Sequence, residues 1–211
     1  MIRVRATVLG FLLAWCGASQ AARLQVTITT AAGVPVDDAA VVITPISGAM
    51  PKRHSTLSIA QKDREFIPYL TIVQSGTAVS FPNQDPFKHH VYSFSPVKSF
   101  EIKLYAGKST QPVVFDKPGE VAIGCNVHDW MEAYILVVDS PYFGKSDRNG
   151  RALIANVPTG RYRLRLWHSS QKAEVPLQDI ELGTATSKLD LVMDVAPRVV
   201  KPKPPADHDH Y

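Results

Sequence analysis

The stretch Gly124-Cys-Asn-Val-His-Asp-Trp-Met-Glu-Ala133 places three different metal-binding side chains on one short segment. His128 follows Cys125 by three residues, and Met131 follows His128 by three more. A single tight loop can direct side chains at this spacing toward one point. A soft thiolate, an imidazole and a thioether form a donor set that suits copper. The stretch therefore predicts a copper site on a loop, with a strand following at about Ala133.

The first 21 residues are typical of a secretory leader. Two arginines precede an apolar run at 8–18, and Ser19-Gln20-Ala21 offers the small residues of a cleavage site. The run is too short to span a bilayer, and Trp15 argues against lipid attachment at Cys16. We therefore expect a periplasmic protein without a membrane span, whose net charge falls from +4 to +2 when the leader arginines are removed. This small charge does not favour nucleic acid or an anionic membrane as a partner.

Removal of the leader would take Cys16 away and leave Cys125 as the one cysteine of the mature chain. An unpaired, exposed thiol in an oxidising compartment is prone to oxidation or dimerisation. Either a ligand occupies this thiol, or it is a buried and chemically inert cysteine. The histidine and the methionine at loop spacing beside it favour a thiol that binds a metal.

After the leader, short strand-like runs follow one another with turn residues between them. Apolar and polar residues alternate at 24–30, and a glycine turn interrupts the run at 69–81. No long segment keeps a helical periodicity. This pattern predicts an all-β chain of β-sandwiches with antiparallel pairing. The chain has 211 residues, 45% of them hydrophobic and 20% charged, which is enough for one or two compact domains.

The segment 65–139 resembles the cupredoxins, the blue-copper fold. The motifs that carry the resemblance are Phe66-Ile-Pro before a strand, Phe81-Pro-Asn83-Gln-Asp85 leading to His89-His90-Val91, and Cys-x-x-His-x-x-Met before a strand at 133–138. Each motif alone is weak, but their order and spacing together are specific. The resemblance implies a Greek-key β-sandwich with one type 1 copper ion. Its ligands would be a histidine of the Asn-x-Asp-x-x-x-His segment together with Cys125, His128 and Met131.

The chemistry of this ligand set agrees with what the resemblance implies. Two imidazoles and a thiolate in a trigonal arrangement, with a weak axial thioether, suit copper in both oxidation states. No strong coordination position remains for a substrate, so the set favours passage of single electrons. Zinc would prefer a harder donor or a second thiolate to Met131, and a hydrolytic metal needs an open position for water. We therefore predict an electron carrier that is not an enzyme.

Two adjacent histidines leave the upstream ligand open. Neighbouring side chains on an extended strand point to opposite faces, so His89 and His90 cannot both point inward. The cupredoxin pattern implies His89, which follows Asp85 by four residues. His90 is the alternative, and it stands where the family commonly has asparagine or threonine.

Other residues near the motif have two possible roles each. Asn83 is expected either to tie its strand to the ligand loop or to shape a turn. Trp130 is expected either to form an apolar docking face or to pack inside. Asp129 and Glu132 either steer a basic partner or are only solvated.

The segments that flank the cupredoxin-like part resemble a second β-sandwich. Residues 24–45 are similar to the opening strands of a carboxypeptidase regulatory-like domain, and 146–166 are similar to its later part. The N-terminal piece is too short to bury a core alone. We therefore predict a small Ig-like or transthyretin-like sandwich split between 24–45 and 144–194, with the cupredoxin domain at 46–143 inserted into it. The alternative is two successive β units, with the first strands joining the cupredoxin sheet.

Beyond Ala196 the composition changes abruptly. Dense proline and few apolar residues predict an extended, disordered tail at 195–211. His208 and His210 can hold a metal weakly, but a solvated tail is the simpler expectation. His54 and His168 have no companion ligands nearby in the sequence, so we expect both at the surface.

The order of segments over most of the mature chain is similar to the cupredoxin-type methylamine-utilisation proteins. The similarity includes 89–96, 124–131 and Val-Asp-Ser-Pro-Tyr-Phe at 138–143. It implies a periplasmic accessory or electron-transfer protein with copper, a cytochrome or a dehydrogenase as its protein redox partner, and a link to an amine dehydrogenase system. Two other functions stay open: a module that delivers or stores copper, and a structural β-sandwich in which a metal braces the loop.

Overall fold

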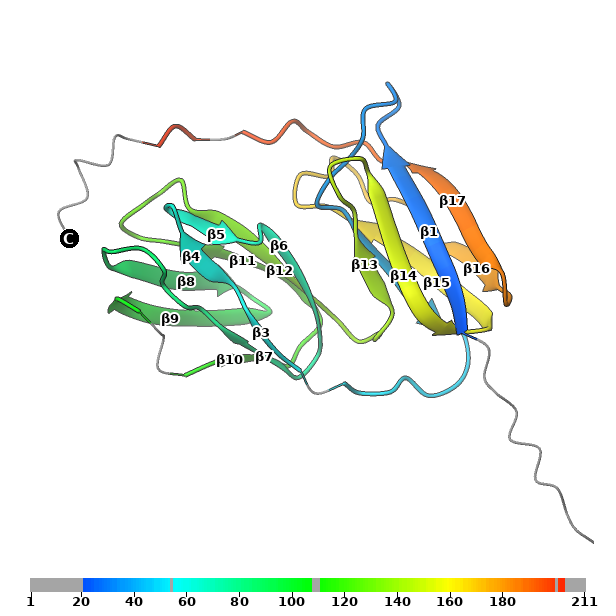
Figure 1. The fold of residues 1–211 in the computed structure, drawn as a ribbon, viewed down its shortest axis with the longest axis horizontal. Coiled ribbons are helices and arrows are strands. Elements are labelled where there is room, and N and C mark those ends of the chain that lie inside the picture. The colour runs from blue at the N-terminus through cyan, green and yellow to red at the C-terminus, as the bar shows by residue number, and fades with distance from the viewer. Residues whose placement is uncertain (1–20, 54, 108–110, 200, 204–211) are drawn as a thin grey trace, which may run out of the picture.

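The computed structural model describes residues 21–53, 55–107, 111–199 and 201–203. Within these ranges the chain is all-β and has no helix, as predicted, so it also offers no candidate membrane-spanning helix. The strands gather in two lobes that lie side by side (Figure 1). Apart from Ala21, the predicted leader lies outside the described residues, and so do His54, His208 and His210.

One lobe, called the flanking lobe, combines strands from both ends of the described chain. Its strands are β1 (Ala21–Thr29), β2 (Ala40–Pro45), β13 (Phe143–Lys145), β14 (Arg151–Pro158), β15 (Gly160–Trp167), β16 (Gln178–Leu182) and β17 (Thr186–Val192). One sheet has the order β14-β1-β17 and the other has the order β13-β2-β15-β16. β1 runs antiparallel to β14 and parallel to β17, whereas β2 is antiparallel to both of its neighbours. In the described chain, therefore, the two N-terminal strands share their sheets with late strands only.

Side chains that alternate in burial build the core of the flanking lobe. In β1, Leu24, Val26 and Ile28 are buried at every second position, while the alternate residues Arg23 and Gln25 are exposed. The buried side chains belong to one cluster with residues of the facing sheet, such as Leu164. Because successive residues of a strand point to opposite faces, this pattern fixes the register of β1.

The other lobe, called the central lobe, is formed by the strands between. These are β3 (Thr56–Ser58), β4 (Ala60–Lys62), β5 (Glu65–Ile67), β6 (Leu70–Gln74), β7 (Thr77–Ser80), β8 (His89–Ser95), β9 (Lys98–Tyr105), β10 (Val113–Phe115), β11 (Gly119–Gly124) and β12 (Glu132–Val138). The larger sheet has the order β6-β12-β11-β8-β9, and a smaller sheet has the order β10-β7-β3. The core of this lobe contains Phe81 and Phe115, and it also contains Cys125 and Met131.

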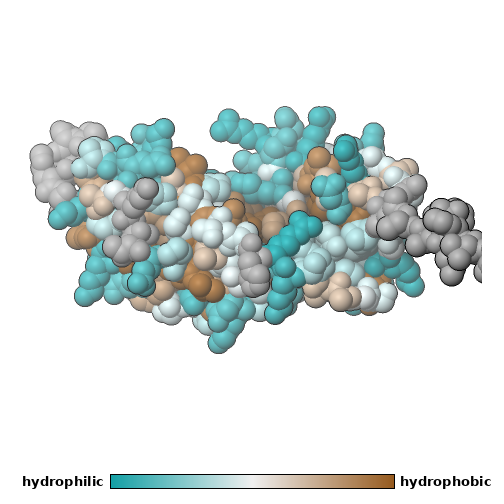
Figure 2. All heavy atoms as spheres, turned by 60° about the horizontal axis from the view of Figure 1, so that its bottom comes forward, coloured by the Kyte–Doolittle hydropathy of each residue, from teal (hydrophilic) through white to brown (hydrophobic). Residues whose placement is uncertain are grey.

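A third hydrophobic cluster joins the two lobes. The outer faces of β6 and β12 present Leu70, Ile72, Leu136 and Val138 to Ala40, Val42 and Trp167 of the flanking lobe. Strands buried on both faces have continuous apolar sequences, which explains why β6 lacks the alternation seen in β1. The Trp167 indole N–H also donates to the Glu120 carboxylate at 2.8 Å. In the space-filling view, hydrophobic side chains show in the hollow near the middle of the molecule, while hydrophilic ones cover much of both ends (Figure 2).

His168, at the end of β15, is only 8% exposed, so the prediction that it lies at the surface is wrong. His168 follows the buried Trp167, and it lines a pocket together with Tyr69 and Arg198. Its Nδ1 accepts a hydrogen bond from the Ser170 N–H at 3.0 Å. Burial lowers the pKa of His168, although the nearby Asp37 and Asp38 oppose this effect. No local pattern indicated this burial, because the residues that cover His168 are distant in the chain.

The cluster between the lobes predicts the effect of truncating Trp167. We expect Trp167→Ala to lower the free energy of unfolding by about 3–5 kcal/mol, because it leaves a cavity in the cluster between the lobes. Denaturant unfolding measures the loss. Leu153→Ala is a matched control, since Leu153 is 52% exposed, and it should change the stability by less than about 0.5 kcal/mol. Equal losses in the two variants would contradict the interface.

Burial of His168 also predicts a pH dependence of stability. The unfolded chain takes up a proton at this ring near pH 6.5, whereas the folded chain takes it up only at lower pH. The free energy of unfolding should therefore fall as pH drops through about 6.5. In His168→Gln the free energy of unfolding should fall less steeply with pH than in the wild type. Above about pH 8 the two proteins should show the same pH dependence. Urea unfolding across this range checks the prediction, and identical slopes in both proteins would refute it.

Candidate metal centre

Three of the predicted ligands meet at one point inside the central lobe. His89 begins β8, whereas Cys125 and His128 lie on the loop between β11 and β12, called the ligand loop (125–131). Their exposed fractions are 0%, 2% and 2%. One donor atom from each of the three lies within 4.8 Å of the others. Residues distant in the sequence therefore converge in a buried place.

The donor atoms form a triangle of a size that suits a metal ion. The two Nδ1 atoms of His89 and His128 are 3.1 Å apart. The Cys125 sulfur lies 3.9 Å from the first and 3.8 Å from the second. A point equidistant from the three atoms in their plane is about 2.1 Å from each, close to the ~2.0–2.3 Å of metal bonds to imidazole and thiolate. The donor set and its geometry thus fit a trigonally bound ion.

Asp85 orients the His89 ring. Its carboxylate Oδ2 lies 2.7 Å from His89 Nε2, so the proton of the neutral ring stays on Nε2 and the Nδ1 lone pair faces Cys125 and His128. The same carboxylate accepts hydrogen bonds from the backbone N–H groups of Asp63 and Arg64 at 2.7 and 3.0 Å. Burial acts to raise the pKa of Asp85. The bonds from Arg64, His89 and Asp63 outweigh it and hold this pKa below its usual value.

Asn83 shapes the turn that leads to Asp85 and His89. Its Oδ1 accepts a hydrogen bond from the Asp85 N–H at 2.9 Å, and its Nδ2 donates to the carbonyls of Phe87 and Tyr105 at 2.8 and 3.0 Å. Of the two roles expected for Asn83, these bonds show the turn role. The link that they add goes to the end of β9 at Tyr105 instead of the ligand loop.

The ligand loop is closed by its own backbone. The Met131 N–H donates to the His128 carbonyl at 2.9 Å, and the Cys125 N–H donates to the Met131 carbonyl at 3.3 Å. Met131 is 2% exposed and belongs to the core of the central lobe. The rings of Phe87 and Trp130 lie 5.7 and 5.1 Å from the His128 ring. The loop therefore holds His128 between two aromatic side chains.

His90 points away from this cluster. Its Nε2 lies 2.9 Å from the Glu101 carboxylate, on the strand next to β8. Its ring is also 5.6 Å from the Tyr92 ring. The structure thus places His89 beside Cys125 and His128, and it places the neighbouring His90 on the opposite face of the strand.

Two residues near the site have roles that sequence reasoning missed or left open. Trp130 is partly buried, and its Nε1–H donates to the Arg64 carbonyl at 3.3 Å, with the Arg64 guanidinium 5.8 Å from the ring centre. Of the two roles expected for Trp130, these contacts favour internal packing. The support that Asp85 gives was missed, although its place four residues before His89 was visible in the sequence.

Comparison with known proteins yields structures but no family or curated relative, since neither a family model nor a curated protein matches the chain. Amicyanin from Paracoccus versutus is 14% identical, covers 46% of this chain and 97% of its own, and has a TM-score of 0.34. A purple cupredoxin from Nitrosopumilus maritimus is 18% identical over 38% of this chain and 98% of its own, with a TM-score of 0.35. A copper-containing nitrite reductase from Thermus scotoductus is 20% identical over 54% of this chain and 28% of its own, with a TM-score of 0.37. These partial similarities concern the fold alone.

The contact between Asp85 and His89 predicts weaker metal binding when it is lost. Asp85→Asn keeps the size of the side chain but removes the charge that fixes the His89 proton, so we expect copper affinity to fall by about 10–100-fold. Competition with a chelator of known affinity measures the change. Asp116→Asn is the control, because this carboxylate is 60% exposed and pairs with Lys98. An affinity loss of the same size in the control would contradict the role of Asp85.

Proposed function

We propose that this chain is a type 1 copper protein that carries single electrons between protein redox partners. The observation that carries the proposal is the buried triangle of two imidazole nitrogens and one cysteine sulfur, with separations of 3.1, 3.8 and 3.9 Å. His89, Cys125 and His128 would be the strong ligands and Met131 the weak axial one. Copper bound there would supply a reversible one-electron change.

The protein holds the proposed ligands in a fixed geometry. Asp85 keeps the His89 ring in one tautomer, and the two backbone hydrogen bonds of the ligand loop hold Cys125, His128 and Met131 in register. A site that moves little when its charge changes favours fast electron exchange, because little structure has to be rearranged. The hydrophobic core around Cys125 excludes water from the ligands and so influences the reduction potential.

Burial of the ligand atoms favours this function over the alternatives. A catalytic metal needs a position open to substrate or water, whereas the three donor residues are at most 2% exposed. A delivery module has to release its metal, which is harder from a closed core than from an exposed loop. We therefore infer an electron carrier that is not an enzyme and that keeps its copper ion.

The setting of the protein is part of the proposal. We infer export to the periplasm by the leader at 1–21, a cytochrome or a dehydrogenase as the redox partner, and a link to an amine dehydrogenase system. We also propose that the flanking lobe is one domain of the carboxypeptidase regulatory-like type, split into 24–45 and 144–194 around a cupredoxin domain at 46–143. The strand orders support this division, because β1 and β2 pair with strands from β13 onward.

Absorption spectroscopy tests the proposed function. The chain loaded with Cu(II) should show an intense visible band from thiolate-to-copper charge transfer, which Cys125→Ser should abolish. The adjacent histidines supply a matched pair of variants. His89→Ala should lose or greatly weaken the band, and His90→Ala should keep both the band and reversible voltammetry.

Two results would overturn the assignment. A wild-type copper protein with weak colour would favour delivery, storage or bracing of the loop. Strong colour that persists in His89→Ala but disappears in His90→Ala would transfer the ligand role to His90.

A further inference from the structure

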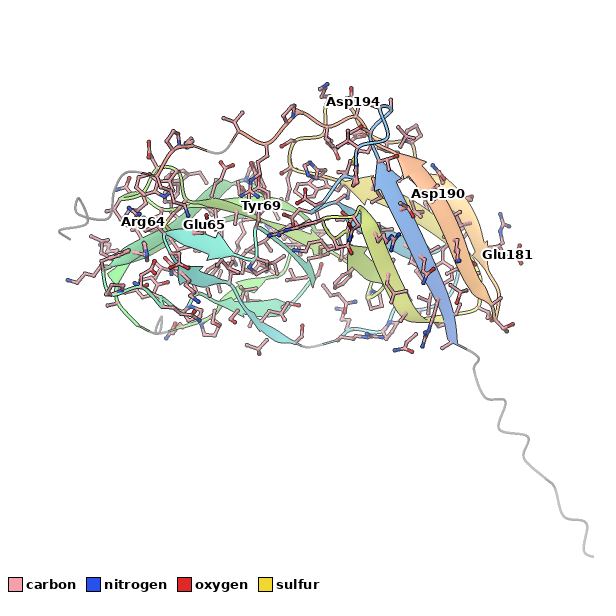
Figure 3. The ribbon with its side chains drawn as sticks, turned by 45° about the horizontal axis from the view of Figure 1, so that its top comes forward. Arg64, Glu65, Tyr69, Glu181, Asp190 and Asp194 are labelled. Atoms are coloured by element: carbon pink, nitrogen blue, oxygen red, sulfur yellow. The ribbon has the colours of Figure 1, made fainter. Side chains whose placement is uncertain are left out.

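The C-terminal segment crosses from the flanking lobe to the central lobe (Figure 1). Val195 forms a bridge with Gln171, and the Ala196 N–H donates to the Ser170 carbonyl at 2.9 Å. These contacts anchor the start of the segment beside the flanking lobe. From there the described residues up to Lys203 continue over the central lobe, on the side where Tyr69, Glu65 and Arg64 lie (Figure 3).

Each of the three described cations in this segment has a contact on the central lobe. The Arg198 guanidinium lies 3.4 Å from the centre of the Tyr69 ring. Lys201 donates to the Asp129 carbonyl at 2.7 Å. Lys203 donates to the Asp63 carbonyl at 3.2 Å and forms an ion pair with the Glu65 carboxylate. The contacts are spaced along the segment, so they fix its path and not only one point of it.

The surface under the segment borders the ligand loop. A groove of about 270 Å³ lies between them, and its lining includes Trp130, Met131 and Glu132 together with Val199 and Lys201. We call the acidic residues of this surface, Asp63, Glu65, Asp129 and Glu132, the acidic rim. Two members of the rim, Asp129 and Glu132, are immediate neighbours of the ligand loop residues His128 and Met131.

The contacts of the segment are individually weak. The Lys203 and Glu65 side chains are 32% and 53% exposed, so water and salt screen their attraction. The segment stays in place because its anchor at Val195 gives it a high local concentration. A competitor with several cations can therefore displace it, whereas a competitor without them cannot.

We propose that residues 197–199 and 201–203 form a displaceable strap over the acidic rim, and that the rim is the docking surface for a partner protein with basic side chains. Charge complementarity selects this partner, because Lys203 of the chain itself pairs with the Glu65 carboxylate, and Lys201 and Lys203 donate to the backbone carbonyls of the rim residues Asp129 and Asp63. The first half of the proposal concerns only this chain. The second half rests on the proposed electron-transfer function, since a partner seated there lies against the ligand loop.

Nuclear magnetic resonance of the full chain tests the strap without reference to any redox activity. The backbone amides of Arg198, Val199, Lys201 and Lys203 should be restricted at low ionic strength in the wild type. They should become mobile in the triple variant Arg198→Gln/Lys201→Gln/Lys203→Gln. Salt at about 1 M, where the Debye length is about 3 Å, should release the wild-type strap in the same way. A segment equally mobile in the wild type and in the variant at low salt would refute the strap. This result would hold whether or not the chain forms the proposed copper site.

Electron exchange with two purified cytochromes tests the docking surface. With a basic c-type cytochrome at low salt, the triple variant should react about 3–10-fold faster than the wild type, because the competitor is gone and the rim is more negative. With an acidic c-type cytochrome it should gain nothing. The matched control is Arg161→Gln/Arg165→Gln/Lys188→Gln, which removes the same charge from exposed positions of the flanking lobe. An equal gain in the control would show an effect of net charge only and would refute docking at the rim.

The two proposals can fail separately. If the chain shows no redox-active copper, the proposed function fails, and docking is then measured by titrating the labelled chain with the same basic cytochrome. Resonance shifts at Asp129 and Glu132 that grow in the triple variant would support the rim. Shifts elsewhere on the central lobe would refute it. Glu65→Gln/Glu132→Gln should weaken both strap and cytochrome binding, and unchanged binding of both would equally refute the rim.

Discussion

Two-sided burial of strand β12 is the constraint on which the rest of the structure depends. Its inner face adds Ala133, Ile135 and Val137 to the core of the central lobe. Its outer face adds Leu136 and Val138 to the cluster between the lobes. The ligand loop ends where this strand begins, so the position of the loop is set by both hydrophobic clusters at once. A shift of the strand by one residue would exchange the two faces and displace the loop as well.

The predicted ligands of the candidate metal centre are likewise held in place by contacts outside the triangle of donor atoms. The His89 ring is fixed by Asp85, and Asp85 is fixed in turn by backbone N–H groups at Asp63 and Arg64. The ligand loop is fixed by its own backbone and by packing of Phe87 and Trp130 around His128. The segment 63–89 and the ligand loop are therefore each held by contacts of their own at the place where they meet.

Much of this arrangement could be predicted from local sequence, and the remainder depends on distant contacts. The spacing of Cys125, His128 and Met131 indicated a loop because such spacing acts over a few residues. The cupredoxin pattern implied His89 instead of His90, but which of the two side chains faces Cys125 depends on how strand β8 packs against distant residues. The burial of His168 depends on Tyr69 and on residues near Arg198. The contacts of Lys201 and Lys203 were invisible for a similar reason, since a proline-rich segment has no periodicity to indicate what it touches.

The parallel pairing of β1 with β17 has a consequence for how the chain folds. The described strands of the central lobe lie between residues 56 and 138, so β1 cannot complete its sheet until the more distant β14 and β17 have reached it. During that interval an apolar strand has two open backbone edges, which is the situation in which polypeptides associate with one another. Such long-range pairing also slows folding. The rate at which active protein accumulates should therefore depend on protection of this one strand more than on assembly of the lobe that contains Cys125.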